Sequence, residues 1–286
     1  MTVDAQLPAS RSRLWLPRVS LSACARGVML RDTRGLLLQP AQRLNYFPAS
    51  PLCCLSWWFS GQSLMLPFDQ PDAVPQPLPG RWVFGGPQQG PVLSCNPGPV
   101  HAMMLLLAPD ALQHLIGLRP EHWVNRVDDA RAVLPPDWLA MCEAVQQADD
   151  DDRRLALVED FLDPRWQAAR PRQTGGARRY EDWTQGLALR AASSAPGRSL
   201  RQAERRIKQW AGQSMRQLRG LARAERAFFD VAAAGQPDWS EVALDAGYAD
   251  QSHLCRETRR VTGFSPAELH RRVHHDEAFW AYRLWA

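Results

Sequence analysis

One stretch near the end of the chain, Trp239–Leu269, limits the possible folds more than any other part of the sequence. The apolar residues at the start of this stretch recur with the spacing of one face of a helix. Gly247 follows where this helix must stop, because glycine adopts a left-handed C-cap without strain. Asp250 then stands at the N-cap position of a second helix. The second helix can pack inward through an apolar stripe and expose polar, arginine-rich faces. Two helices joined by such a turn are what entry into a DNA major groove requires.

A similar arrangement lies about 50 residues earlier. Ser199 is placed to cap a helix over residues 200–211, and Gly212 follows that helix. Between the two units, residues 215–231 show the pattern of a long helix rich in leucine, alanine and arginine. Such a connector can hold two polar helices about 34 Å apart, which is one turn of DNA. The sequence therefore predicts two helices that enter successive major grooves.

Residues 178–273 resemble the paired helix-turn-helix domain of the AraC/XylS family of bacterial transcription regulators. The residues that carry the resemblance in the second unit are Ala243, Gly247, Tyr248, Asp250, Ser252, His253, Leu254, Arg256, Arg260, Gly263, Ser265 and Pro266. The first unit departs more from the family pattern, since Pro196 lies in its turn and Glu204 stands among the base-contacting positions. The resemblance implies a sequence-specific regulator that binds promoter DNA and acts on RNA polymerase, more often as an activator than as a repressor.

The same resemblance supplies the candidate DNA-binding side chains. The base-contacting candidates are Arg201, Gln202, Glu204 and Arg205 in the first unit and Gln251, Ser252, His253 and Arg256 in the second. The candidates for phosphate contacts or structural ion pairs are Arg198, Arg206, Arg259 and Arg260, and Ser199 is included with them at the helix start. Arginine and glutamine can pair bidentately with guanine and adenine edges, each good pair giving about 1–3 kcal/mol of discrimination.

The first 170 residues have a different sequence pattern, in which short apolar and aromatic runs are separated by proline and glycine. Strands are expected over residues 52–59, 82–84, 92–94 and 100–108, and a hairpin is expected to join 27–31 to 36–38. Helices are expected over 111–118, 136–147 and 153–168. Many short strands with such turns favour a β-sandwich or small barrel.

These patterns predict an α+β protein of two domains. Residues 1–170 would form a β-rich domain with a helical end, residues 171–177 a linker, and residues 178–286 an all-α domain of two helix-turn-helix units joined by a long helix. Segments 43–59, 79–88 and 100–108 also resemble the sensor-type domain of one AraC subgroup. That resemblance implies a domain for effector binding or dimerisation, for which a cupin-like fold is one candidate.

Aromatic residues gather in the expected strands of the first domain. Trp57, Trp58 and Trp82 could line a pocket for a flat or cationic effector. Such residues more often belong to a core, with alternate side chains on the two sides of a sheet, and we favour that interpretation. The three tryptophans remain the effector-binding candidates.

The balance of charged residues also differs between the first 170 residues and the rest of the chain. From Pro171 onward there are 19 Lys and Arg against 13 Asp and Glu, whereas residues 1–170 hold 15 and 17. A basic second part is typical of a protein that meets a polyanion, although a solvated basic surface has the same composition. No apolar run is long enough for a membrane span, and we expect a cytoplasmic protein.

Alternatives to a ligand-controlled regulator remain open. A dimeric DNA-binding protein could lack any effector, with the first domain serving to form a homodimer. An alkylation-response repair protein with an accessory helix-turn-helix would need zinc-binding cysteines near a reactive thiol, and Cys24, Cys53, Cys54 and Cys95 lack paired spacing. The sequence shows no motif for catalysis, so we expect a protein without enzymatic activity, metal or cofactor.

Overall fold

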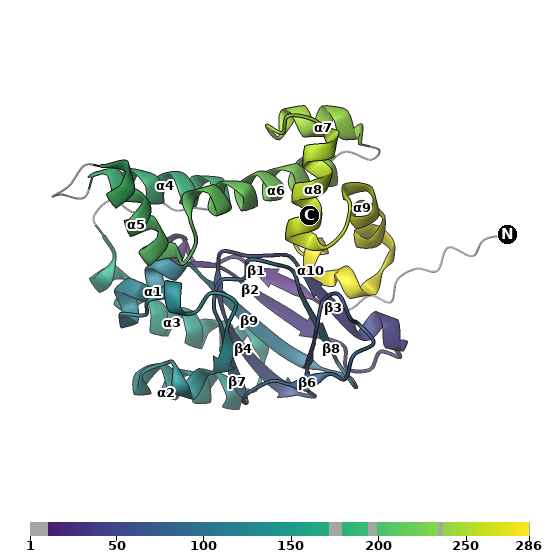
Figure 1. Cartoon of the computed structure of the whole chain (residues 1–286). Helices are drawn as coiled ribbons and strands as arrows, with labels where there is room; N and C mark the ends of the chain where they lie inside the picture. The colour runs from purple at the N-terminus through teal and green to yellow at the C-terminus, as the bar shows by residue number, and fades with distance from the viewer. Residues whose placement is uncertain (1–10, 172–178, 194–198, 234–236, 286) are drawn as a thin grey trace.

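A computed structural model describes residues 11–171, 179–193, 199–233 and 237–285. The expected linker 171–177 lies almost wholly outside the described residues. In Figure 1 the chain forms a β-sandwich with helices on one side, and a helical region lies across the top of the sandwich in this view. The α+β class predicted from the sequence is confirmed.

Two antiparallel sheets make up the sandwich. The larger sheet has the order β1-β2-β9-β4-β7-β10, and the smaller sheet has the order β3-β8-β5-β6. The strands are β1 (Arg13–Trp15), β2 (Ala25–Asp32), β3 (Leu44–Phe47), β4 (Cys53–Ser60), β5 (Leu64–Leu66), β6 (Gln76–Pro77), β7 (Trp82–Gly85), β8 (Val92–Cys95), β9 (His101–Leu107) and β10 (Val127–Asp129). The long strands β2, β4 and β9 pair centrally, and β4 is continuous as its apolar sequence predicts.

The hairpin expected between residues 27–31 and 36–38 is wrong. β2 ends at Asp32, and residues 36–38 form no strand. The reason lies at Thr33, whose N–H donates to the Val100 carbonyl at 2.8 Å and whose Oγ1 accepts from the Val100 N–H at 2.9 Å. These bonds tie the end of β2 to the start of β9, so β2 pairs with β1 and β9 instead.

Three helices cover one side of the larger sheet: α1 (Pro109–Ile116), α2 (Pro136–Gln147) and α3 (Asp151–Ala169). Alternate strand residues such as Leu55, Trp57 and Leu105 point to these helices and form the main core with them. The intervening residues point the other way, toward the smaller sheet. This alternation decides which side chains belong to the core and which face the space inside the sandwich.

The helical region contains α4 (Tyr180–Ser193), α5 (Leu200–Ala211), α6 (Met215–Ala233), α7 (Trp239–Asp245), α8 (Gln251–Thr262) and α9 (Pro266–His275). A short segment, residues 277–283, follows α9 as a 3-10 turn (Glu277–Phe279) and α10 (Trp280–Arg283). We call residues 277–283 the C-terminal segment. It returns from the helical region to the sandwich (Figure 1).

Candidate nucleic-acid interface and sensor cavity

The second helix-turn-helix unit consists of α7 and α8. Gly247 ends the first helix with a φ of 77°, which is the left-handed conformation that favours glycine. Asp250 caps α8, since its Oδ1 accepts from the His253 N–H at 2.6 Å. The turn chemistry therefore fixes the angle at which α8 leaves α7.

The helix α8 is buried on one side and exposed on the other. Leu254, Thr258 and Val261 are buried: Leu254 packs near Ala243 of α7, whereas Val261 packs near Ala49 of the sandwich. The exposed candidates are Gln251, Ser252, Arg256, Arg259 and Arg260, and His253 is half-buried. The His253 ring packs edge-on against Tyr248 at 5.2 Å, and Arg260 pairs with Glu257 at 2.9 Å. Amide and guanidinium groups thus remain on the open side of α8.

The first unit consists of α4 and α5. Ser199 caps α5 by accepting from the Gln202 N–H at 3.3 Å, while Ile207 and Ala211 bury the inner side of the helix. The exposed candidates on α5 are Arg201, Gln202, Glu204 and Arg205. Arg198 lies outside the described residues. The first unit therefore presents an open polar helix as the second does.

Arg206 differs from the other candidates. It is half-buried, and its Nη1 donates to the Ala191 carbonyl of α4 at 3.1 Å. This bond holds α5 against α4, which favours the structural of its two predicted roles over the phosphate contact. Arg259, which is exposed at the end of α8, is better placed to contact a phosphate.

The long helix α6 connects the two units. Its 19 residues span about 28 Å at ~1.5 Å per residue. Figure 1 shows α5 near one end of α6 and α8 near the other. The length of this connector is comparable with one DNA turn, about 34 Å.

Two glycines at helix ends provide a matched test of this domain. Gly247 and Gly263 both have positive φ, but an added Cβ at Gly263 would come within 2.0 Å of the Phe68 ring. Around Gly247 nothing among the described atoms lies within 4 Å of that position. We expect Gly247→Ala to cost about 1–2 kcal/mol from left-handed strain alone. Gly263→Ala should cost more, because Phe68 must also move. Thermal melting of the two variants would show which of them loses more stability.

Residues of both sheets, of the helical region and of the C-terminal segment line a cavity of about 610 Å³. Most of its lining is apolar, and it includes Met29, Phe47, Trp58, Met65, Met104 and Leu106. A few polar side chains interrupt this lining, among them Arg31, Asn45 and Ser94. The cavity also reaches the helical region, because Leu221 of α6 and Thr258 of α8 line it. Size and lining are those of a small-molecule site.

Only part of the predicted aromatic pocket faces this cavity. Trp58 lines it, whereas Trp57 and Trp82 point to the opposite side of the larger sheet and belong to the main core. Trp57 is fully buried and donates from Nε1 to the Cys142 carbonyl at 3.3 Å. Trp82 donates from Nε1 to the Gln146 side chain of α2 at 3.2 Å. The grouping of the three tryptophans around one effector is therefore corrected to Trp58 alone.

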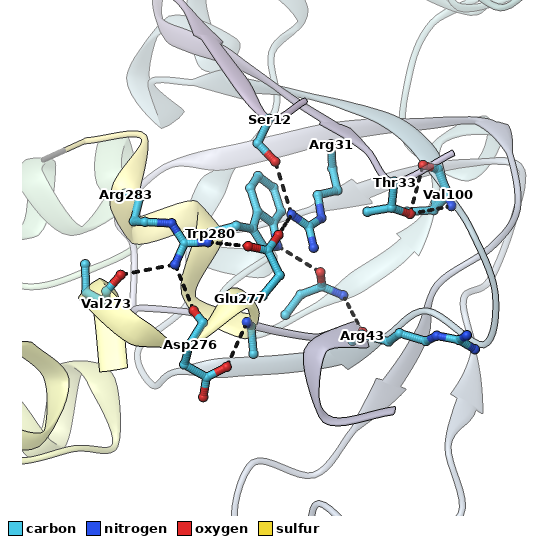
Figure 2. Close-up of polar contacts among 12 residues, drawn as sticks. Ser12, Arg31, Thr33, Arg43, Val100, Val273, Asp276, Glu277, Trp280 and Arg283 are labelled. Atoms are coloured by element: carbon cyan, nitrogen blue, oxygen red, sulfur yellow. Dashed lines mark hydrogen bonds and ion pairs between the residues drawn. The ribbon is translucent and has the colours of Figure 1, made fainter. Parts of the chain in front are cut away.

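The C-terminal segment packs against the sandwich beside the cavity, and no local pattern in the sequence predicts this. Trp280 is 2% exposed, contacts Met29 and Phe47, and donates from Nε1 to Asn45 Oδ1 at 2.8 Å. Arg31 lies over the Trp280 ring with its guanidinium carbon 5.0 Å from the ring centroid. The segment is therefore joined to two polar residues of the cavity lining (Figure 2).

Glu277 forms the charged part of this contact. One carboxylate oxygen accepts from Arg31 Nη1 at 2.5 Å, and the other accepts from Arg283 Nη2 at 2.7 Å (Figure 2). Both Arg31 and Glu277 are buried, with exposures of 2% and 1%. Burial lowers the pKa of Arg31, while the attraction of Glu277 opposes that shift.

Two further ion pairs join the helical region to the first domain. Asp110 of α1 pairs with Arg190 of α4 and accepts from Trp183 Nε1 at 3.0 Å. Arg26 of β2 pairs with Glu225 of α6 at 2.6 Å. The first unit is thus anchored on α1, and the connecting helix is anchored on β2.

Cys24, Cys53 and Cys142 are buried, whereas Cys54, Cys95 and Cys255 are half-buried. Burial raises the pKa of Cys54 to about 11, and it raises the pKa of Cys53 further. These thiols stay protonated near neutral pH, which disfavours the nucleophile that a repair protein needs. Among the described residues, no group of three His, Cys, Asp or Glu side chains has the arrangement of a metal site. In the same part of the chain, no helix combines the length and apolar character needed to cross a membrane.

Comparison with known proteins identifies one part of the chain. Residues 193–272 match the family model described as a helix-turn-helix domain. No curated protein matches the chain. Among solved structures, an apo variant of ToxT from Vibrio cholerae aligns with 86% of this chain and 96% of its own, at 11% identity and a TM-score of 0.40. A second ToxT structure from Vibrio cholerae aligns with 80% of this chain and 94% of its own, at 11% identity and a TM-score of 0.39.

The similarity to ToxT is too weak to carry a functional argument, so the identification depends on the domain match and on the helices described above. The match covers α5 to most of α9, which includes both exposed helices and their connector. Residues 193–272 are therefore an AraC-type helix-turn-helix domain, and the chain that carries them is a DNA-binding transcription regulator.

Proposed function

We propose that this protein is an effector-responsive regulator that binds one promoter site through two successive major grooves. The observation that carries the proposal is the pair of capped helices, α5 and α8, which expose arginine and glutamine side chains near the two ends of α6. Helices of this kind enter the major groove, and a fixed separation selects half-sites one turn apart. Occupancy of the site would alter recruitment of RNA polymerase, in the cytoplasm and without enzymatic activity.

The operator can be found by selection from a pool of random DNA duplexes, followed by footprinting of the selected sequences. We expect two protected segments on one side of the duplex, separated by about one helical turn. A single protected segment, or no enrichment of any sequence, would contradict the two-groove proposal.

Arg256 gives the sharpest test of sequence recognition. Arg256→Ala is expected to weaken binding to the selected operator by about 1–3 kcal/mol and to relax preference at one base pair. Arg259→Ala, the matched control on the same helix, should weaken all sequences similarly and lower the salt slope by about one. Fluorescence anisotropy with operator and single-base variants at several salt concentrations separates these effects. Similar sequence profiles for both variants would contradict the assignment.

The cavity supports the effector-responsive part of the proposal. A protein whose first domain served for dimerisation alone would need no such hollow, whereas here a cavity of about 610 Å³ with an apolar lining and a few polar groups lies between the sandwich and the helical region. Residues of both the sandwich and the helical region line the space, so a bound molecule could affect how α6 and α8 are held. A homodimer remains compatible with this arrangement, and light scattering of the free protein would test it.

A further inference from the structure

We propose that the cavity binds an apolar molecule with an anionic head group, that Arg31 holds this head group, and that Glu277 is its internal competitor. The inference rests on the proposed function, because it assigns a chemical class to the effector of that function. It also names the contact through which the effector would reach the DNA-binding helices.

The first support is the state of the Arg31 side chain. Arg31 lines the cavity and is 2% exposed. Its Nη1 donates to Glu277 at 2.5 Å and to Ser12 Oγ at 3.2 Å, but Nε and Nη2 have no acceptor among the described residues. Buried donors without acceptors are unfavourable. A carboxylate, sulfonate or phosphate could accept from both nitrogens at once, as the planar guanidinium favours.

The second support is the balance of charge around this residue. Glu277 is shared between Arg31 and Arg283, so one carboxylate serves two guanidinium groups. Arg26 also lines the cavity, and it pairs with one carboxylate of the lining, that of Glu225. The place where an anion would improve the balance is therefore the Arg31 end of the cavity.

The third support is the character of the remaining lining. Around Arg31 the strands contribute Met29, Met104, Leu106 and Phe47, which form an apolar surface inside the sandwich. An anion without an apolar body would gain nothing from these residues, whereas a tail or ring system would bury its surface against them. The chemical class is thus amphipathic, with charge at one end.

Competition follows from the shared partner. A head group that accepts from Arg31 takes up the donors that now hold Glu277, which lowers the attraction between the sandwich and the C-terminal segment. Phe279 and Tyr282 of this segment pack against Leu269 and Val273 of α9, the helix that follows α8. Ligand binding would therefore loosen the second helix-turn-helix unit from the sandwich. By linkage, a protein already loosened would bind the ligand more tightly.

The test uses the full chain and two fluorescent probes with the same aromatic body. 8-Anilinonaphthalene-1-sulfonate carries a sulfonate, and N-phenyl-1-naphthylamine lacks it. We expect the sulfonate probe to bind with a stoichiometry of one. Arg31→Met should lower the affinity for this probe by about tenfold or more and leave the affinity for the neutral probe unchanged. Equal loss of both probes, or no loss of either, would overturn the proposal.

Glu277→Gln tests the competition directly and keeps an acceptor for Arg31. We expect this variant to bind the sulfonate probe several-fold more tightly. The matched control is Asp276→Asn, which removes the same charge one residue earlier but keeps the oxygen that caps the 3-10 turn. If both variants change the affinity equally, the competition is excluded. This comparison decides the matter even if Arg31→Met fails to fold.

Binding to the selected operator, measured on the same samples, separates this inference from the proposed function. Operator binding without any charge-dependent probe binding would overturn the inference alone. Charge-dependent probe binding by a protein that enriches no DNA sequence would overturn the proposed function alone.

Discussion

Replacing Glu277 by leucine is expected to lower the free energy of unfolding by about 3–5 kcal/mol, because it leaves a buried guanidinium without an anion. Arg31 is nearly inaccessible to water, so solvent cannot replace the lost carboxylate. Guanidinium chloride titrations followed by tryptophan fluorescence and by circular dichroism would measure the change. Two probes are needed since the sandwich and the helical region can unfold separately.

The losses in the free energy of unfolding that two further variants cause distinguish a charge effect from a packing effect. Arg31→Met should cost less than Glu277→Leu, because Glu277 keeps its pair with Arg283. The double variant should recover much of the loss, since a buried ion pair replaced by apolar groups is often close to neutral. A double variant whose loss equals the sum of the single losses would contradict this explanation.

Replacing Trp280 by alanine is the second large effect that we expect, at about 3–5 kcal/mol. The change empties a buried volume beside Met29 and Phe47 and removes the ring beneath the Arg31 guanidinium. It also removes the donor to Asn45 Oδ1. Hydrogen exchange should show faster opening of α9 along with the lower stability.

Trp280→Phe is the matched control for that prediction. It keeps an aromatic ring against Arg31 but loses the indole N–H, so we expect a cost of about 1 kcal/mol for the hydrogen bond together with a smaller packing loss. If alanine and phenylalanine variants were equally destabilised, packing at this position would not hold the segment.

The helices of the DNA-binding domain could be predicted because their signals are local. Ser199 and Asp250 cap α5 and α8 as the sequence indicates, and Gly212, Gly247 and Gly263 have positive φ at the expected helix ends. Each signal depends on a few neighbouring residues. Which side chains touch DNA stays a prediction, although the exposed side of each helix agrees with the assignment.

The cavity and its contacts could not be predicted in the same way. Alternation along β4 shows that Trp57 and Trp58 point to opposite sides, but it does not show which side the helices cover. The partners Arg31 and Glu277 are 246 positions apart. No periodicity links them, and the aromatic residues after α9 are too few to show a pattern. The local hint is a charged residue, Arg31, at the end of an expected apolar strand.

The separation in sequence between Arg31 and Glu277 has a consequence for biosynthesis. Chains are made from the N-terminus, and domains generally fold as they emerge. The sandwich can therefore assemble long before residues 277–283 are translated. Until then Met29, Phe47 and Leu106 lack the Trp280 cover that they have in the finished protein. The nascent chain passes through an interval with an uncovered apolar surface, which makes this surface a natural target for chaperones that bind exposed apolar groups.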